Sequence, residues 1–387
     1  MARIAYLDHS FHRTTKSTAF LPEILVRHGH SVDFFWDDAW QGGAPVPWED
    51  VQSHDVVIMF QSYCAPEKRY FRQSHPNVVY IPMLDQFGIW LGPIFNLSGF
   101  WEPFHGSKVL NFSNAVHCMT TGFGIVSYFA RYYQPILHPV PKPPQQGLHG
   151  FFWLRRELQL PWRVIRRLIE NTRFDSLHIH LATDPGTLPP ELPSAEDVAR
   201  HRITTSVWFE NKAELNALME RANVFFAPRL EEGIGQSFLE AMCRGQCVVA
   251  PNQGTMNEYI IPGVNGLLYD NDNPQPLDFS AVHKLGAEAR NGVSAGRLIW
   301  EQGEADLVRF ILTPSEALYA GKYQHAFEGD AGQPEPVPTL AASHAKLPPL
   351  TLAARLRRVA QRHAIFKSTR FLWHPMIGFV RHIIGRQ

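Results

Sequence analysis

The sequence predicts an α/β protein of two Rossmann-like, doubly wound domains that face each other across a cleft. Two observations support this prediction. Short β-rich runs alternate with helical stretches in two successive series along the 387-residue chain, and a proline-rich segment separates the two series. Strands separated by helices are typical of βαβ units and parallel sheets. With 45% hydrophobic and 19% charged residues, the chain has enough apolar material for two packed domains.

The first series lies within residues 1–140, the predicted first domain. Its elements are a strand at 3–8, a helix near 20–29, and strands at 32–36, 55–60, 77–83 and 108–112. The segment 139–147, PVPKPPQQG, contains four prolines in nine residues. Such a composition indicates a stiff, extended linker and therefore a domain boundary.

The second series lies within residues 150–312, the predicted second domain. Its strands are expected at 150–156, 177–182, 206–209, 223–228 and 247–251, and a helix near 294–312 closes it. Residues 313–349 are then expected to be a connection and linker. In doubly wound sheets, ligands bind beyond the carboxyl ends of the strands, so the loops that follow the strands are expected to carry the chemistry.

Composition narrows the class of protein. The sequence contains no run of about 18 apolar residues, the length needed to span a bilayer, and its N-terminus lacks the pattern of a signal peptide. The four cysteines form no CxxC pair, which is typical of free thiols in a reducing compartment. We therefore expect a cytoplasmic enzyme. The sequence contains no P-loop or HExxH motif, which counts against P-loop and metalloprotease classes. Nucleic-acid binding has no support outside the C-terminal tail.

A glycine-containing loop follows the predicted strand 223–228. After Arg229 and two glutamates come Gly233, Ile234, Gly235 and Gln236. Glycines let the backbone approach a ligand closely, and the helix that follows presents free N–H groups and a positive dipole end. The loop therefore predicts a phosphate site. Glu232 and Glu240 are placed to accept hydrogen bonds from sugar hydroxyls on either side of a diphosphate, although such loops and solvated glutamates are also common without this role.

With the residues that follow it, this loop resembles the donor-binding half of glycosyltransferase family 4, most strongly over residues 223–270. The matching positions are Pro228, Glu232, Gly233, Gly235, Leu239 to Met242, Gly245, Val248 to Ala250, Gly254, Glu258, Asn265 and Gly266. The resemblance is looser over 150–312 and is one of architecture alone over the first 140 residues. It implies the GT-B fold and retention of configuration at the transferred sugar.

The resemblance also implies roles for individual residues. Glu232 would hold sugar hydroxyls of the donor at the catalytic centre, the amides from Gly233 to Gln236 would face its sugar and phosphates, and Glu240 would bind the ribose. In the retaining mechanism, the leaving phosphate takes the proton of the acceptor. The protein then supplies charge stabilisation and orientation instead of a dedicated base. Neither a cofactor nor a metal ion is expected, because the nucleotide-sugar is a substrate.

The diphosphate-binding cations depart from the family's pattern, which places Gly-Arg at the end of the first strand and Lys-Gly shortly after it. This chain has FFWLRRELQLPWRVIRR, which offers Arg155 or Arg156 for the arginine but has no lysine. Arg163 or Arg166 is expected to substitute, because a guanidinium binds phosphate bidentately. The alternative for Arg163 is an exposed position on a helix near 162–170.

The first domain is expected to hold the acceptor. Asp85 follows the strand 77–83 and is the main acceptor-side catalytic candidate, with a helix cap as the alternative. Further candidates in the loops are His9, His12, Arg13, Lys16, His117 and Thr121. Asp270 to Asp272 form an Asp-x-Asp motif, but their setting favours a turn over a metal site, and His178 and His180 are expected to be a buried pair on a strand.

We therefore expect a retaining hexosyltransferase-type glycosyltransferase that moves a sugar from a nucleotide diphosphate to a glycan. A lipid-linked oligosaccharide in the synthesis of bacterial surface polysaccharide, such as lipopolysaccharide, is the expected acceptor. Two alternatives stay open, namely a GT-B epimerase or phosphorylase and a catalytically degenerate GT-B scaffold. Release of nucleotide from a panel of sugar nucleotides distinguishes them.

The C-terminal tail, residues 350–387, differs from the rest of the chain. Formal charge balances overall, with 36 basic and 36 acidic residues, yet residues 336–387 contain nine Lys or Arg and no acidic residue. Apolar positions recur at helical spacing beside a basic face. We expect this tail to bind the anionic inner surface of the cell membrane. The alternative is a helix that packs on the first domain.

Overall fold

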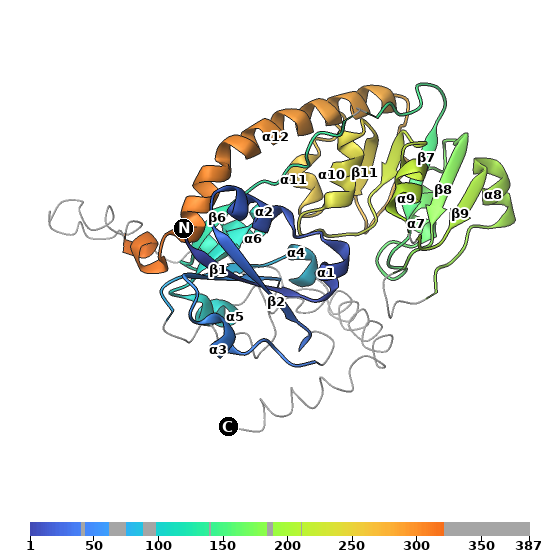
Figure 1. The fold of residues 1–387 in the computed structure, drawn as a ribbon. Coiled ribbons are helices and arrows are strands. Elements are labelled where there is room, and N and C mark those ends of the chain that lie inside the picture. Colours follow the sequence, from blue (N-terminus) through green and yellow to red (C-terminus); the bar gives the residue numbers. More distant parts are fainter. Residues whose placement is uncertain are drawn as a thin grey trace, which may run out of the picture. The chain divides into compact units, whose positions relative to one another are not determined.

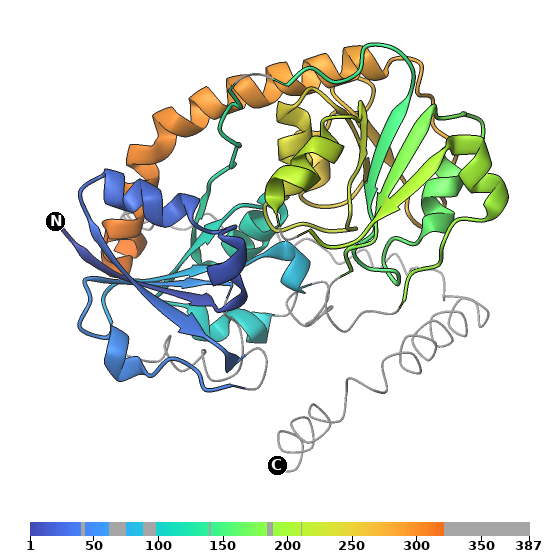
Figure 2. The same cartoon turned by 45° about the vertical axis from the view of Figure 1, so that its right-hand side comes forward.

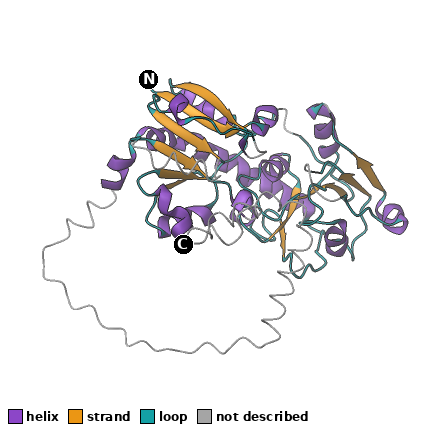
Figure 3. Ribbon diagram, turned by 90° about the horizontal axis from the view of Figure 1, so that it is seen from below, coloured by secondary structure: helices purple, strands orange, loops and turns teal. Residues whose placement is uncertain are grey.

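The computed structural model describes residues 1–39, 43–61, 75–87, 98–138, 141–183, 189–209 and 211–320 (Figure 1). These residues belong to one compact unit, Met1–Glu328. The tail at 350–387 and most of the linker at 313–349 lie outside the described residues. Within the unit, strands are flanked by helices, as the view coloured by secondary structure shows (Figure 3).

The first sheet is built from the N-terminal part of the chain. Its strands are β1 (Arg3–His9), β2 (Ser31–Asp37), β3 (Val56–Phe60), β4 (Val78–Ile81), β5 (Lys108–Asn111) and β6 (Val126–Phe129). The helices between them are α1 (Phe11–Thr15), α2 (Phe20–Arg27), α3 (Trp48–Val51), α4 (Leu84–Gln86), α5 (Ser98–Trp101), the 3₁₀ helix η5 (Glu102–Phe104) and α6 (Asn114–Gly122). The strand order is β2-β1-β3-β4-β5-β6, and all neighbours are parallel.

The second sheet has the same construction. Its strands are β7 (His149–Trp153), β8 (Ser176–His180), β9 (Ile203–Ser206), β10 (Val224–Phe226), β11 (Cys247–Pro251) and β12 (Leu267–Tyr269). The helices are α7 (Trp162–Leu168), α8 (Ala195–His201), α9 (Lys212–Met219), α10 (Gln236–Cys243), α11 (Met256–Tyr259) and α12 (Val282–Leu312). The order is β12-β11-β10-β7-β8-β9, again with parallel neighbours.

Most expected elements are present, and four differ. The closing helix, expected near 294–312, is longer and begins at Val282. The strand expected at 206–209 lies earlier, at Ile203–Ser206, where Ile203 is buried against the sheet. The strand expected to continue to residue 156 ends at Trp153, because the Arg156 carbonyl accepts the amides of Gln159 and Leu160 in a turn. The strand β6 was not expected, since its pattern VSYF is short and has only one fully buried side chain.

The helix α12 connects the two sheets within the unit. It runs for 31 residues from the second sheet back to the first (Figure 2). Near its middle, Trp300 packs against Phe20 and Tyr132, with ring centroids 6.1 and 5.1 Å away. At its end, the buried Lys108 ammonium donates to three main-chain carbonyls at 2.5–2.7 Å. None of the described helices, α12 included, combines the length and apolar character that a bilayer span requires.

Each sheet contains a point where the strand order reverses. In the first sheet the reversal lies between β1 and β3, and in the second it lies between β7 and β10. Neighbouring loops diverge at such a point, which opens a crevice at the carboxyl ends of the strands. The residues that follow β1, β3, β7 and β10 therefore define where a ligand is expected.

Candidate functional site

The loop after β10, residues 229–235, lies at the reversal point of the second sheet and is called the donor loop below. Its last residue, Gly235, has a φ of +77°, which glycine adopts without strain, and it begins α10. Because Gly235 has no side chain to cap the helix, the amides of the first turn of α10 remain available to an anion. The first turn contains no acidic residue that would repel one.

The donor loop packs closely against the first domain. A Cβ atom at Gly233 would lie 2.6 Å from the Met83 sulfur and 2.9 Å from a carboxylate oxygen of Asp85. On the same side, the Gln236 side chain donates to the carbonyl of Ser17 at 2.6 Å. Glycine at 233 is therefore favoured by the close approach of the Met83 and Asp85 side chains, a requirement separate from ligand binding.

Three charged side chains form a buried cluster at the donor loop. Nη1 of Arg229 lies 2.7 Å from Oδ2 of Asp85 and 3.9 Å from Oε2 of Glu232. The side chains of all three are only 10–13% exposed. One cation therefore lies between two carboxylates that come from different domains. Thr255 holds the donor loop in place, because its hydroxyl donates a hydrogen bond to the main-chain carbonyl of Glu232.

The surroundings of Glu232 act on its ionisation in opposite directions. Burial raises the pKa of Glu232 above its ordinary value of 4.5, and the nearby Asp85 raises it further, while Arg229, Arg155 and Arg156 lower it. Burial also raises the pKa of the adjacent Glu231, again with a contribution from Asp85. A buried carboxylate held by cations is suited to accept hydrogen bonds from ligand hydroxyls.

The structure brings Arg155 and Arg156 into the electrostatic neighbourhood of Glu232. Both follow the end of β7, and both lower the pKa of that carboxyl. The Arg155 guanidinium lies over the Trp153 ring, 4.7 Å from its centroid. Because the strand has already ended, alternation of side chains along a strand does not decide which of the two faces the donor loop.

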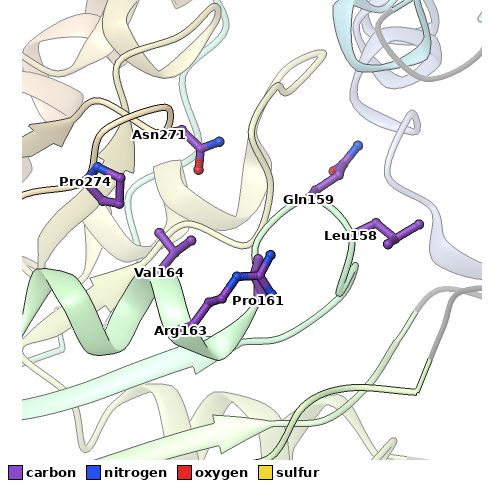
Figure 4. Close-up of a pocket in the computed structure, with 7 residues that line it drawn as sticks. All are labelled: Leu158, Gln159, Pro161, Arg163, Val164, Asn271 and Pro274. Atoms are coloured by element: carbon purple, nitrogen blue, oxygen red, sulfur yellow. The ribbon is translucent and has the colours of Figure 1, made fainter. Parts of the chain in front are cut away.

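Arg163 lies in a different environment. It is on α7, its side chain is 67% exposed, and its closest charged partner is Glu191 at 3.8 Å. Figure 4 shows it lining a pocket with residues that include Leu158, Pro161, Asn271 and Pro274. Arg163 is not among the main influences on the pKa of Glu232, whereas Arg155 and Arg156 are. Electrostatics thus group Arg155 and Arg156 with the donor loop, whereas Arg163 pairs with Glu191 and Arg166 with Asp197.

The remaining expected residues divide between backbone and side-chain positions. Ile234 is buried in the hydrophobic core, so only its main chain is available to a ligand. Glu240 lies on α10, where it pairs with Arg244 at 3.6 Å, and its side chain is 26% exposed. Asp270 accepts the amide of Asp272 at 2.9 Å, which is a local turn, and the rings of His178 and His180 bond to hydroxyls on β9.

Asp85 does not cap a helix. The residue before α4 is Met83, and no side chain caps this short helix. The carboxylate of Asp85 instead binds Arg229. Sequence reasoning assigned no role to Arg229, although its place between a buried strand and two glutamates is a signal for a buried cation.

Glu258 links the two domains in a way that the sequence did not predict. Its carboxylate accepts the hydroxyl of Ser113 at 2.9 Å and the amides of Asn114 and Ala115 at 2.8 and 3.3 Å. These groups belong to the start of α6, so a residue of the second domain caps a helix of the first. Its role in this structure is to hold the two domains together.

Two parallel sheets of this topology, with a glycine-containing loop and the buried Glu232 at the reversal point of the second sheet, agree with the GT-B fold expected from the sequence. The model of the family of glycosyl transferases group 1 matches residues 149–283. This match covers the second sheet, the donor loop, and both Glu232 and Glu240. Residues 149–283 are thus similar to this family, which supports the expected hexosyltransferase-type glycosyltransferase. The chain has the GT-B fold that its sequence predicts.

Similar solved structures agree on the fold. Sucrose-phosphate synthase from Thermosynechococcus elongatus has a TM-score of 0.57 and 13% identity, over 85% of this chain and 100% of that chain. HepE from Anabaena, solved in complex with UDP-glucose, has a TM-score of 0.55 and 14% identity, over 80% and 100%. A glycosyltransferase from Rickettsia africae ESF-5 has a TM-score of 0.54 and 14% identity, over 80% and 98%. No curated protein sequence matches the chain.

Proposed function

We propose that this protein is a retaining glycosyltransferase that transfers a hexose from a nucleoside diphosphate sugar to a glycan acceptor. The observation that carries the proposal is the buried cluster of Arg229, Glu232 and Asp85 beside the open amides of α10. A carboxylate held in this way orients sugar hydroxyls, while helix amides and arginines stabilise the negative charge that develops on the leaving diphosphate. The HepE structure with UDP-glucose makes a uridine nucleotide the first donor to test.

The nucleotide is proposed to lie across the carboxyl ends of β7 and β10. Arg155 and Arg156 would hold the diphosphate, and Glu240 would bind the ribose. The aromatic residues Trp153 and Trp208, which follow or end strands of the second sheet, are suited to stack on a nucleobase. Trp208 is 56% exposed, and its ring centroid lies 6.0 Å from that of Trp153 in an edge-to-face arrangement. In this arrangement the anomeric carbon lies near Glu232 and the acceptor approaches from the first domain.

The proposed acceptor is a lipid-linked oligosaccharide in the synthesis of bacterial surface polysaccharide. The basic tail at 350–387 would bind anionic lipid and bring the first domain close to such an acceptor. Sedimentation with phosphatidylglycerol vesicles tests this part, with a chain truncated after Pro349 as the comparison. Loss of vesicle binding in the truncated chain supports the role of the tail, and unchanged binding contradicts it.

The function itself is tested by nucleotide release. The full chain is incubated with UDP-, GDP- and dTDP-sugars and a mixture of glycans, and Glu232→Gln is the matched control. We expect one donor to release nucleotide with the wild type and not with the variant, and NMR of the product to show the anomeric configuration of the donor. An inverted product contradicts retention. Epimerised donor, or phosphorolysis with added phosphate, favours the epimerase or phosphorylase alternative. Tight nucleotide binding without turnover favours the scaffold alternative.

A further inference from the structure

A second cluster of polar side chains lies at the reversal point of the first sheet. Asp8, near the end of β1, is completely buried and accepts three hydrogen bonds. The donors are the main-chain amide of His9 at 2.8 Å, the Nδ1 of His12 at 2.7 Å and the hydroxyl of Thr18 at 2.6 Å. Both oxygens of the Asp8 carboxylate therefore accept hydrogen bonds from the protein.

This arrangement fixes the orientation of the His12 ring. When Nδ1 carries the proton that it donates to Asp8, the Nε2 of a neutral His12 is a hydrogen-bond acceptor. Among the described residues, no hydrogen bond to this Nε2 is present, and the side chain is 12% exposed. The neighbouring His9 ring lies 3.8 Å from the His12 ring, and burial lowers the pKa of His9 to about 4, so His9 is neutral at physiological pH.

The cluster lies on the first-domain side of the donor loop. Ser17, which follows α1, accepts the Gln236 side chain at the start of α10. His9 contacts Gln61 after β3 at 3.2 Å, and the charge of Asp85 acts on His9. Asp85 in turn binds Arg229 in the donor loop. The Gln236–Ser17 and Arg229–Asp85 contacts therefore connect the donor loop, at the reversal point of the second sheet, to the first domain.

We propose that Nε2 of His12 accepts a hydrogen bond from a hydroxyl group of the sugar acceptor other than the attacking one, with Asp8 as the positioning residue that holds the ring. This inference rests on the proposed function and names the part of the first domain that binds the acceptor. Asp8, His9 and His12 have potential metal-ligand atoms within 4.8 Å of one another. Their hydrogen bonds fit an orienting pair better, since both oxygens of Asp8 already accept hydrogen bonds from the protein.

Two substitutions at His12 separate acceptor binding from a structural role. The amide nitrogen of His12→Asn can still donate to Asp8 but no atom replaces Nε2, whereas His12→Gln can place a polar atom near Nε2 and loses the bond to Asp8. The assay compares nucleotide release from the active donor with water as acceptor and with octyl glycosides of glucose, galactose and mannose. The exposed His105, changed to Gln, serves as the control.

For His12→Asn we expect donor hydrolysis to stay near wild type and kcat/KM for the glycoside to fall by about tenfold or more, with a raised KM. His12→Gln should retain more of the glycoside reaction than His12→Asn. If His12→Asn matches the wild type and His12→Gln is impaired, the ring only supports Asp8 and the inference is overturned. An equal loss of hydrolysis and transfer overturns it as well.

A binding measurement separates this inference from the proposed function. The wild-type chain is labelled with ¹⁵N-histidine, and the Nε2 resonance of His12 is assigned by its absence in His12→Asn. We expect at least one of the three octyl glycosides to shift this resonance, whether or not the chain releases nucleotide. If none does so up to its solubility limit, the acceptor subsite is refuted even when glycosyl transfer to other acceptors is observed.

Discussion

Replacing Arg229 with Met keeps most of the side-chain volume and removes the cation that lies between Asp85 and Glu232. Both carboxylates are about nine-tenths buried, and the arginine is 2.7 Å from one and 3.9 Å from the other. Removing one partner of a buried pair typically costs about 3 to 5 kcal/mol. Because a tenth of each side chain still meets water, we expect about 3 kcal/mol less stability at pH 8.

The loss should depend on pH in a defined direction. Arg229 lowers the pKa of Glu232, so its removal raises that pKa further above the ordinary 4.5. As the pH falls, Glu232 in the variant becomes protonated first and the repulsion with Asp85 disappears. The deficit relative to wild type should therefore be largest at pH 8 and smaller near pH 5.

Urea unfolding of the wild type and Arg229→Met at both pH values measures this effect. Asp85→Asn in the Arg229→Met background should restore about 2 kcal/mol of the loss, because the two sites are directly coupled. Arg309→Met is the matched control, since its pair with Asp306 is exposed and worth less than about 1 kcal/mol. An equal deficit at both pH values, or no rescue in the double variant, would refute the reasoning.

Three more predictions concern the donor site and the fold. Glu232→Gln should lower turnover roughly 30- to 900-fold, from a barrier increase of about 2 to 4 kcal/mol. The pKa of Glu232 is raised in the folded state, so ionised Glu232 lowers the stability of the wild type at pH values above the ordinary pKa of 4.5. At pH 8, Glu232→Gln should therefore unfold at the wild-type melting temperature or higher, and this advantage should disappear below pH 4.5. A lower melting temperature of the variant at pH 8 contradicts this. The double variant Arg155→Ala, Arg156→Ala should bind nucleoside diphosphate at least about tenfold more weakly by calorimetry, whereas Arg163→Ala should match wild type; the reverse result would move the phosphate site to α7. Lys108→Met should lower the free energy of unfolding by about 2 kcal/mol, since three carbonyls at the end of α12 lose their side-chain donor. A change under about 0.5 kcal/mol would show that water replaces the Lys108 nitrogen.

Local patterns in the sequence were sufficient to predict most of the strands. Buried parallel strands such as Val56–Phe60 and Cys247–Pro251 are short apolar runs bounded by turn residues, and these can be recognised without knowledge of their neighbours. The strand Ile203–Ser206 was misplaced because two of its four side chains are exposed, whereas the more apolar residues that follow it are in a loop. Here the position of a strand depends on its partner β8, which local pattern does not reveal.

The candidate site was predictable where chemistry and chain order coincide. Glu232 and the glycines of the donor loop are consecutive in the sequence, so their pattern indicates a site directly. The contact of Arg229 with Asp85 joins residues 144 positions apart. The bond of His12 to Asp8 joins residues four positions apart, but its place at the edge of the sheet follows from the reversal of strand order between β1 and β3. The Arg229–Asp85 contact and the location of the His12–Asp8 pair therefore both depend on strand order, which the sequence pattern did not determine.

The most direct test of the donor site is a crystal structure of the full chain with a nucleoside diphosphate sugar. We predict that the sugar hydroxyls bind the Glu232 carboxylate and that the diphosphate lies between the amides of α10 and the side chains of Arg155 and Arg156. A diphosphate bound instead at Arg163, or a sugar with no contact to Glu232, would contradict it.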